Sequence, residues 1–330
     1  MIFGVDIKET EIRDWGHDIL ANLLKDRTTN ENIIWATNDY TSLGKGYSFY
    51  ETITADLVCI DDCRIIQPRI SKSLEEQKKR ISEKAEVFTP SWICNSQNNL
   101  IDKNWFQTDK DVFNRELEST HSWEMTSCLP AYPKGKNWKT YITDIRLEMA
   151  CGEAPYLCSR YDTTTGELIH VERRIGLLDR KLKIVNDNTP DITPDMDGKQ
   201  RKNVHKIWRR NAYKAMQSIY GFEWQGDNLL LARESLLITF IEYYQKKWHT
   251  DKLPDKECLK KVSEIISWNI WQMDGLKYGI PGYDPTEEIN GIQFPIPSRE
   301  KYCRIKEWTC QEPLKGNDII FVQMLNSKKL

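Results

Sequence analysis

DIRLEMACGEAPYL, residues Asp144 to Leu157, carries the strongest structural signal in the chain. Its first half is a short apolar run interrupted by Glu148, and the run breaks at Cys151-Gly152. This pattern predicts a buried strand that ends in a tight turn. A glycine in such a turn lets the backbone approach a ligand closely because it has no Cβ, and a carboxylate at the end of a strand can accept hydrogen bonds from that ligand.

Two later segments end in the same way. Ser218 to Glu223, SIYGFE, predicts a second strand that ends in an acid, and the apolar spacing of Asn228 to Tyr244 predicts the helix that follows it. Ile265 to Leu276, IISWNIWQMDGL, predicts a third strand that closes on Asp274-Gly275. Glu223 lies where a doubly wound nucleotide-binding sheet places the acid that binds a ribose. Three such strands predict a ligand laid across the carboxyl edge of a parallel sheet.

Several short motifs follow one another along the chain. They are AEVFTP at Ala85 to Pro90, EMACG at Glu148 to Gly152 with Tyr156-Leu157 behind it, YGFE at Tyr220 to Glu223 with Asn228 to Leu237 behind it, and QMDGL at Gln272 to Leu276. In order and spacing they resemble the motifs of the N6-adenine DNA methyltransferases of restriction-modification systems. In particular, the chain looks like the short proteins labelled restriction endonuclease subunit M. The resemblance covers about residues 85 to 276.

The resemblance implies an α/β fold, in which a Rossmann-like sheet of the methyltransferase type is flanked by helices, and it implies S-adenosylmethionine as the cofactor. Glu148 and Gly152 would approach the amino-acid and ribose parts of the cofactor, and Glu223 its ribose hydroxyls. Asp274 would approach the adenine amino group, and the Phe-Thr-Pro segment would fold over the methionine end. The cofactor-binding residues implied in this way are Phe88, Thr89, Pro90, Glu148, Ala150, Gly152, Glu223 and Asp274.

One motif of the resembled family is missing. The family holds its flipped-out target adenine with an Asn or Asp side chain and a backbone carbonyl from an N/D-P-P-Y/F motif, whose aromatic ring stacks on the base. The nearest strings are LPAY at Leu129 to Tyr132 and GYDP at Gly282 to Pro285, and neither matches. The glycine turn also differs, because Glu153-Ala154-Pro155 stands where small glycines usually follow. The sequence therefore predicts no catalytic residue.

Two classes of function stay open. In the first, the chain is a DNA adenine-N6 methyltransferase of a restriction-modification or phage-defence system, or its cofactor-binding subunit, and the base-holding residues are replaced or supplied by a partner. In the second, the chain has the methyltransferase fold without this chemistry and serves as a DNA-binding or nuclease-associated subunit. The expected partners are DNA and a restriction nuclease or specificity subunit. A nucleotide-binding α/β protein with another substrate is a third interpretation.

The resemblance divides the chain at residue 85. Residues 1–84 form a predicted N-terminal α+β extension, with an amphipathic helix within 1–24, strands at Ile33 to Ala36 and Asp56 to Ile66, and a charged helix at Ser73 to Lys84. Residues 85–330 form the methyltransferase-like domain, with an irregular insertion at about 102–140 and a Pro/Gly-rich C-terminal segment. Its further predicted elements are helices at Trp92 to Leu100 and Glu172 to Val185, a hairpin within Arg160 to Val171, an exposed loop at Asn186 to Asn203, and strands at Tyr302 to Trp308 and Asp318 to Leu325.

A formal net charge of −2 supplies no general attraction to nucleic acid, so contact with DNA needs a local basic patch. The densest basic cluster is predicted to be that patch. Its members are Lys199, Arg201, Lys202, Lys206, Arg209 and Arg210. Apolar residues recur at helical spacing through the same segment, so the charges are equally compatible with the solvated side of an amphipathic helix.

The nine cysteines stand at irregular spacings with no signal peptide, which is typical of reduced thiols in the cytoplasm. No metal site is predicted. The pairs Cys59/Cys63 and Cys303/Cys310 lack CxxC spacing and a nearby histidine, and the acids Asp39, Asp56, Asp61 and Asp62 lack the E-x-K triplet of a metal-dependent nuclease. No apolar run reaches the roughly 18 residues that a membrane span requires, so no membrane association is expected.

Overall fold

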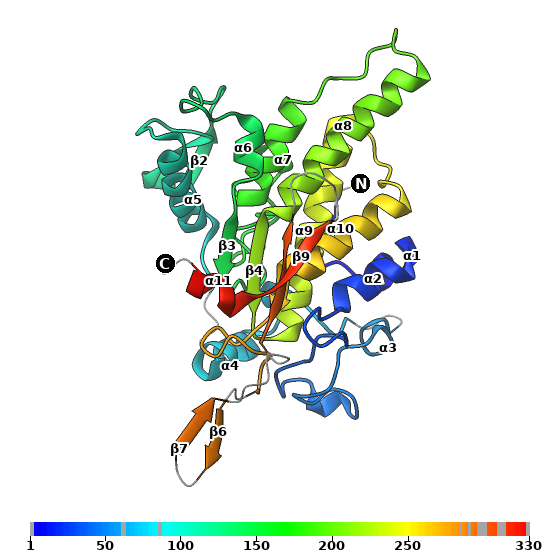
Figure 1. The fold of residues 1–330 in the computed structure, drawn as a ribbon, viewed down its shortest axis with the longest axis vertical. Coiled ribbons are helices and arrows are strands. Elements are labelled where there is room, and N and C mark those ends of the chain that lie inside the picture. The colour runs from blue at the N-terminus through cyan, green and yellow to red at the C-terminus, as the bar shows by residue number, and fades with distance from the viewer. Residues whose placement is uncertain are drawn as a thin grey trace.

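A parallel three-stranded sheet in the order β3-β4-β5 lies at the centre of the molecule (Figure 1). The computed structural model describes residues 3–60, 64–84, 88–283, 286–289, 292–295, 302–308 and 315–327. The strands are β3 Arg146–Met149, β4 Ile219–Glu223 and β5 Ile270–Gln272. In the sheet Met149 lies beside Phe222, and Phe222 lies beside Trp271. The predicted mixed α/β class with a parallel sheet is therefore confirmed.

Helices cover one face of this sheet. They are α8 Gly198–Gln217, which precedes β4, α9 Gly226–Trp248, which follows it, and α10 Lys256–Asn269, which leads directly into β5. α7 Leu177–Asp187 packs against α8 and α9. The predicted apolar face of α9 is fully buried, with Leu229, Leu236, Leu237, Phe240 and Ile241 at most 1% exposed. α9 thus forms the centre of the helical layer.

The opposite face is covered by the last described part of the chain. β8 Arg304–Trp308 pairs with β9 Gly316–Ile320, and α11 Phe321–Ser327 follows. Ile305 and Phe321 pack here against Tyr220, Phe222 and Trp271 of the sheet. The two predicted strands pair as a hairpin, although the second ends earlier than predicted because α11 begins at Phe321.

β3 is an exposed edge strand and not the buried strand that its apolar run predicts. It pairs with β4 alone among the described strands. The side chains of Ile145, Leu147 and Met149 are 65%, 42% and 72% exposed. The register places Leu147 and Met149 beside Tyr220 and Phe222, on the face that the hairpin and α11 cover. The hairpin and α11 do not extend over β3, so the apolar side chains of β3 remain exposed to solvent.

The N-terminal segment is helical and irregular. Its helices are α1 Glu9–Trp15, α2 His17–Leu24, α3 Ala55–Val58 and α4 Leu74–Lys84, with single 3-10 turns at Thr41–Leu43 and Arg69–Ser71. Gly16 divides the single helix predicted for residues 1–24 into α1 and α2. The predicted charged helix before residue 85 is confirmed as α4.

The two strands predicted in this segment are wrong. Within residues 3–60 and 64–84 the structure has no strand, and Asp56 lies in α3. Ile34 makes one isolated bridge to Thr52. The side-chain amide of Gln272 accepts from Ile34 N at 2.9 Å and donates to Ile34 O at 2.8 Å, so it satisfies the backbone that a neighbouring strand would otherwise pair. Asp61, Asp62 and Cys63 lie outside the described residues, as does Cys310.

The predicted irregular insertion contains regular structure. β1 Asn114–Leu117 pairs antiparallel with β2 Ser122–Met125, a 3-10 turn at Glu118–Thr120 joins them, and α6 Trp138–Ile142 follows. α5 Ser91–Phe106 extends beyond its predicted end. Its buried side is polar: Asn95, Asn99 and Asp102 all accept hydrogen bonds from the guanidinium of Arg180 on α7. Apolar periodicity could not indicate the full length of this helix, because polar side chains form much of its buried side.

Several other helices and strands begin or end at residues that differ from the predicted ones, each for a local reason. α10 occupies the first five residues of the predicted third strand, because Leu259, Val262 and Ile266 bury one helical face, and β5 keeps just the three residues before Met273. α8 begins inside the predicted loop, where Asp197 and Gln200 form a capping box. α7 begins at Leu177, after a 3-10 turn at Val171–Arg173, and the predicted hairpin before it is a single bridge between Tyr161 and Leu168.

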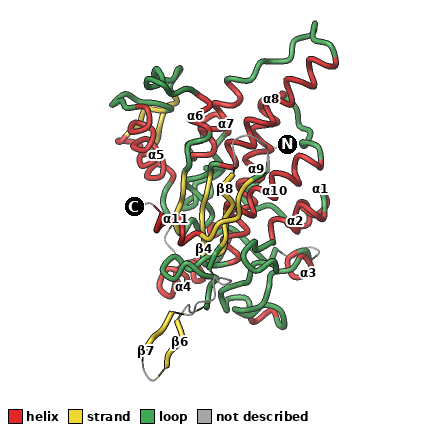
Figure 2. Tube along the Cα trace, in the orientation of Figure 1, coloured by secondary structure: helices red, strands yellow, loops and turns green. Residues whose placement is uncertain are grey.

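The Pro/Gly-rich segment contains a hairpin that its composition did not predict. β6 Thr286–Ile289 pairs with β7 Ile292–Pro295, and it projects from the rest of the fold (Figures 1 and 2). Across the described part of the chain, no helix combines the length and the hydropathy that crossing a membrane needs.

The first residue of α9 is expected to tolerate no side chain. A Cβ on Gly226 would lie 2.1 Å from Ile34 O, so Gly226→Ala should lower the free energy of unfolding by about 3 kcal/mol. Gly198 is the matched control, because it is the first residue of α8 and a Cβ there meets no atom within 4 Å. Gly198→Ala should change the free energy of unfolding in urea by less than about 1 kcal/mol. Equal losses in the two variants would contradict this packing.

Glu9 on α1 is expected to make stability fall as pH rises. It is 3% exposed, and neither its Oε1 nor that of buried Glu234 on α9 has a hydrogen-bond partner within the described residues. Burial raises the pKa of Glu9 from 4.5 to about 8. Because the folded protein keeps a proton that the unfolded chain releases, stability should fall between pH 4.5 and pH 8, by at most about 1.4 kcal/mol per pH unit.

The pH dependence of unfolding in urea tests this assignment. Glu9→Gln should flatten the decline relative to the wild type. Glu11→Gln, an exposed position on the same helix, should keep it. A decline that is unchanged in Glu9→Gln would assign the effect to another group.

Candidate functional site

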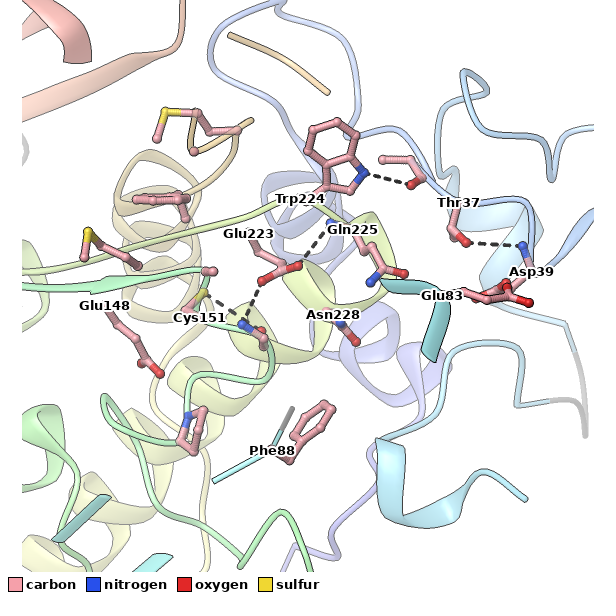
Figure 3. Close-up of a pocket in the computed structure, with 18 of the residues that line it drawn as sticks. Thr37, Asp39, Glu83, Phe88, Glu148, Cys151, Glu223, Trp224, Gln225 and Asn228 are labelled. Carbon is pink, nitrogen blue, oxygen red and sulfur yellow. Dashed lines mark hydrogen bonds between the residues drawn. The ribbon is translucent and has the colours of Figure 1, made fainter. Parts of the chain in front are cut away.

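A cavity of about 920 Å³ opens at the carboxyl edge of the sheet. Its volume lies in the upper part of the range for small-molecule sites. Figure 3 shows Glu223 among the lining residues, with Glu148 on one side and Gln225 and Asn228 on the other. The turn after β3, the turn between β4 and α9, residues 36–39, and α4 all contribute to the wall. A ligand here would touch segments from most of the chain.

Glu223 is the last residue of β4 and is 7% exposed. Its Oε2 accepts a hydrogen bond from Gly152 N at 2.8 Å, and its Oε1 accepts one from Gln225 N at 3.2 Å. Burial raises the pKa of Glu223, and these backbone donors oppose the rise. The carboxylate therefore joins the two turns that follow β3 and β4, at the point where both strands end.

Glu148 is the second acid of the cavity. Its carboxylate accepts from Tyr156 N at 3.4 Å and from Leu157 N at 3.2 Å. Burial raises the pKa of Glu148 well above its usual value, and the charge of Glu223 adds to the rise. Two carboxylates that share a low-dielectric cavity favour a ligand with a positive charge or several hydrogen-bond donors.

The turn that separates these acids has left-handed backbone. Gly152 has a φ of +53°, and Ala150 and Ala154 have φ of +50° and +61°. A Cβ on Gly152 would point toward the ring of Phe88, 3.9 Å away. The guanidinium of Arg69 lies over the same ring, 4.9 Å from its centroid. Phe88 is thereby held against the glycine turn, across the cavity from Glu223.

Six of the eight predicted cofactor-binding residues line the cavity. They are Phe88, Thr89, Glu148, Ala150, Gly152 and Glu223. The strand-end reasoning accounts for the last four, because parallel strands bring their carboxyl ends to one edge. Ala85 to Val87, the first half of the AEVFTP motif, lie outside the described residues.

Pro90 and Asp274 are not among the residues that line the cavity. Pro90 is the N-cap residue of α5. Asp274 Oδ1 accepts from Leu276 N at 2.8 Å and from Lys277 N at 3.1 Å, so it closes the turn after β5. The acid was predicted to contact a ligand because of its place at a strand end. Because the chain turns immediately after β5, the Asp274 carboxylate accepts hydrogen bonds from the backbone of that turn instead.

Part of the wall was not predicted from the sequence. Ala36, Thr37, Asn38, Asp39 and Phe49 come from the N-terminal segment, Lys79 and Glu83 come from α4, and Trp224, Gln225 and Asn228 follow Glu223. Trp224 is 37% exposed, and its indole N–H donates to the backbone oxygen of Ala36 at 3.1 Å. An aromatic residue next to the predicted ribose-binding acid is a signal that the sequence did contain. The N-terminal residues carried none.

The six basic residues of the predicted DNA patch lie on α8 between Lys199 and Arg210, away from the cavity. Figure 1 shows α8 at the end of the sheet opposite α4. A surface hollow there is lined by Lys202, His205, Lys206, Arg209 and Tyr244. Tyr244 is on α9, 18 residues after Gly226, so the hollow lies about 27 Å from the start of that helix at the cavity. Arg209 is already paired with Asp255 at 2.5 Å. The structure therefore keeps the patch and the cavity apart.

Comparisons of the chain with protein-family models, with curated proteins and with solved structures give no match, so the functional proposal rests on the cavity and on the motifs that line it.

Proposed function

We propose that the cavity binds S-adenosylmethionine and that the chain is a DNA adenine-N6 methyltransferase, or the cofactor-binding subunit of one, in a restriction-modification or phage-defence system. The observation that carries the proposal is the position of Glu223. A buried carboxylate ends the middle strand of a parallel sheet and is bonded to the glycine turn of the neighbouring strand. Parallel sheets of nucleotide-binding proteins bind the ribose with an acid at this point.

The residues present fit this cofactor. Glu223 would accept hydrogen bonds from the ribose hydroxyls, and Glu148 would face the amino-acid part. When ionised, the two carboxylates suit a sulfonium ion and an ammonium group, and Phe88 and Trp224 offer aromatic surface at the cavity wall. S-adenosylmethionine would supply an electrophilic methyl group. Because Asp274 closes its own turn, the adenine amino group would be recognised by other groups than the acid first expected.

The proposal assigns the groups that hold the target base to a partner chain. The base-binding motif is missing from the sequence. Met149 and Ala150 line the cavity and are exposed at the open edge of the sheet, so the cavity wall is accessible from that side. Methyl transfer is accordingly expected from an assembly and not from this chain alone.

A second candidate function is a DNA-binding or nuclease-associated subunit without methyl transfer. The separation of the α8 patch from the cavity favours it, because base flipping into the cavity would not need a basic surface about 27 Å away. In that case DNA binding should weaken with salt and with neutralisation of Lys202 and Lys206, while S-adenosylmethionine would leave it unchanged.

Calorimetric titration of the purified protein with S-adenosylmethionine tests the first proposal. We expect a 1:1 complex with micromolar affinity. Transfer of a labelled methyl group to mixed-sequence DNA, measured with and without a lysate of the source cells, then separates a complete enzyme from a cofactor-binding subunit. No binding at millimolar cofactor would overturn the proposal and leave the second candidate.

A further inference from the structure

Arg80 is the one buried residue in the stretch of α4 from Leu74 to Glu83. It is 4% exposed, whereas its neighbours along the helix are exposed or half-buried. The sequence predicts a charged helix here and does not single out any of its side chains for burial. A buried guanidinium is stable when charged and polar groups surround it, so its partners show what the helix packs against.

Asp227, the second residue of α9, fixes this guanidinium. Arg80 Nη1 donates to Asp227 Oδ2 at 2.9 Å, and the hydroxyl of Tyr40 donates to the same oxygen at 2.8 Å. Asp227 is completely buried, with Lys72 Nζ 3.5 Å from it. Burial alone would raise the pKa of Asp227, but Lys72 and Arg80 together hold it well below its usual value. The pair is therefore an ionised contact between α4 and α9.

The other arm of the guanidinium reaches the cavity wall. Arg80 Nη2 lies 3.2 Å from Gln225 Oε1 and 3.4 Å from Asn228 Oδ1. A guanidinium has donors and no acceptor, so it turns both amide oxygens toward itself. Gln225 and Asn228 line the cavity, and Gln225 N donates to Glu223. A chain of direct contacts thus runs from Arg80 to the acid at the end of β4.

We infer that Arg80 is a positioning residue of the cofactor site and that, from α4, it sets the conformation of the turn from Glu223 to Asn228. This inference rests on the proposed function of the cavity. It assigns to the cofactor site a helix that lies before residue 85, outside the segment that resembles methyltransferases. Lysine could keep the charge next to Asp227, but it lacks the planar fork that reaches a carboxylate and two amides together.

The experiment compares Arg80→Lys with Arg174→Lys. Arg174 is the matched control, because it is 6% exposed and its guanidinium binds Glu242 at 2.6 Å without lining the cavity. Hydrogen exchange of the ligand-free proteins is measured on peptides that cover residues 222–230. We expect faster exchange of this turn in Arg80→Lys and unchanged exchange in Arg174→Lys. The affinity for S-adenosylmethionine should fall by about tenfold in Arg80→Lys and stay unchanged in the control.

A double-mutant cycle shows whether Arg80 acts through the turn. In a Gln225→Ala background, Arg80→Lys should cost clearly less affinity than it does in the wild type. Multiplicative losses, or unchanged exchange of residues 222–230 in Arg80→Lys, would overturn the inference. If the wild type binds no S-adenosylmethionine, the proposed cofactor fails, and the exchange measurement still decides the role of Arg80.

Discussion

Glu223→Ala is expected to weaken S-adenosylmethionine binding by about 100-fold or more. The ribose diol would lose two hydrogen bonds to a charged acceptor, each contributing about 1.5–3 kcal/mol. Glu223 also accepts from Gly152 N and Gln225 N, so the substitution loosens both turns of the cavity. Calorimetric titration measures the loss, and circular dichroism establishes that the variant is folded.

Glu153→Ala is the matched control for this loss. Glu153 is a buried carboxylate in the same turn, 3% exposed, and it accepts from Arg69 N and the Tyr161 hydroxyl at 2.6 Å each. It does not line the cavity. Glu153→Ala should lower stability and leave cofactor affinity within a few fold of the wild type. Similar affinities of Glu223→Ala and the wild type would show that the ligand, if any, lies elsewhere.

The pKa of Glu223 adds a pH dependence to the same measurement. Burial raises that pKa, so the carboxyl takes up a proton at a higher pH than an ordinary glutamate. Protonation would remove the charge that the ribose hydroxyls and the sulfonium favour. Affinity for S-adenosylmethionine should therefore increase with pH and reach a plateau above the raised pKa. Affinity that is highest at acidic pH would contradict the assignment of Glu223.

Asp227→Ala is expected to cost about 3–5 kcal/mol of the free energy of unfolding, which is the usual loss when one partner of a buried ion pair is removed. The substitution removes the closer and fully buried of the two carboxylates that pair with Arg80, leaving Asp39 at 3.3 Å, and it removes the acceptor of the Tyr40 hydroxyl. Urea unfolding measures the loss. Asp191→Ala is the control, because Asp191 pairs with Lys247 at the surface, where its side chain is 85% exposed. Its effect should be far smaller.

Acid should distinguish these two variants further. The pKa of Asp227 is lowered in the folded protein, so the unfolded chain takes up this proton first as the pH falls. The stability that Asp227 contributes is present above the usual aspartate pKa of 3.8 and is lost as the pH falls below it. Asp227→Ala should lack this part of the acid transition. An unchanged acid transition would mean that Asp227 is not the buried anion.

Apart from Phe88 and Thr89, the predicted residues that line the cavity are all close to strand ends. Gly152 and Glu223 are 71 residues apart along the chain, yet their hydrogen bond follows once β3 and β4 are accepted as parallel neighbours. Asp274 shows the limit of this reasoning. Its position at the end of β5 is correct, but whether an acid faces a cavity or caps its own turn depends on where the next residues go.

Burial differs from what the sequence predicts in both directions. β3 was expected to be buried because its residues are apolar, and Met149 is 72% exposed. α5 was expected to end at Leu100, but it continues because Asp102 and its asparagines are buried against Arg180. The polarity of a segment predicts its burial where apolar contact alone holds the elements together. It fails where a layer ends before the edge of a sheet or where a hydrogen-bond network replaces apolar contact.

By itself the sequence determined the parallel core of the site. Apolar spacing specified β4 and α9, and a glycine and an acid at two strand ends specified where the cavity lies, because these patterns act over a few residues. The remaining wall was decided by tertiary packing. Arg80 and Asp227 stand 147 residues apart, and nothing in the charged pattern of α4 distinguishes the arginine that is buried from the lysines that are solvated. A side chain's partner across such a distance is set by the docking of whole elements, which local periodicity does not encode.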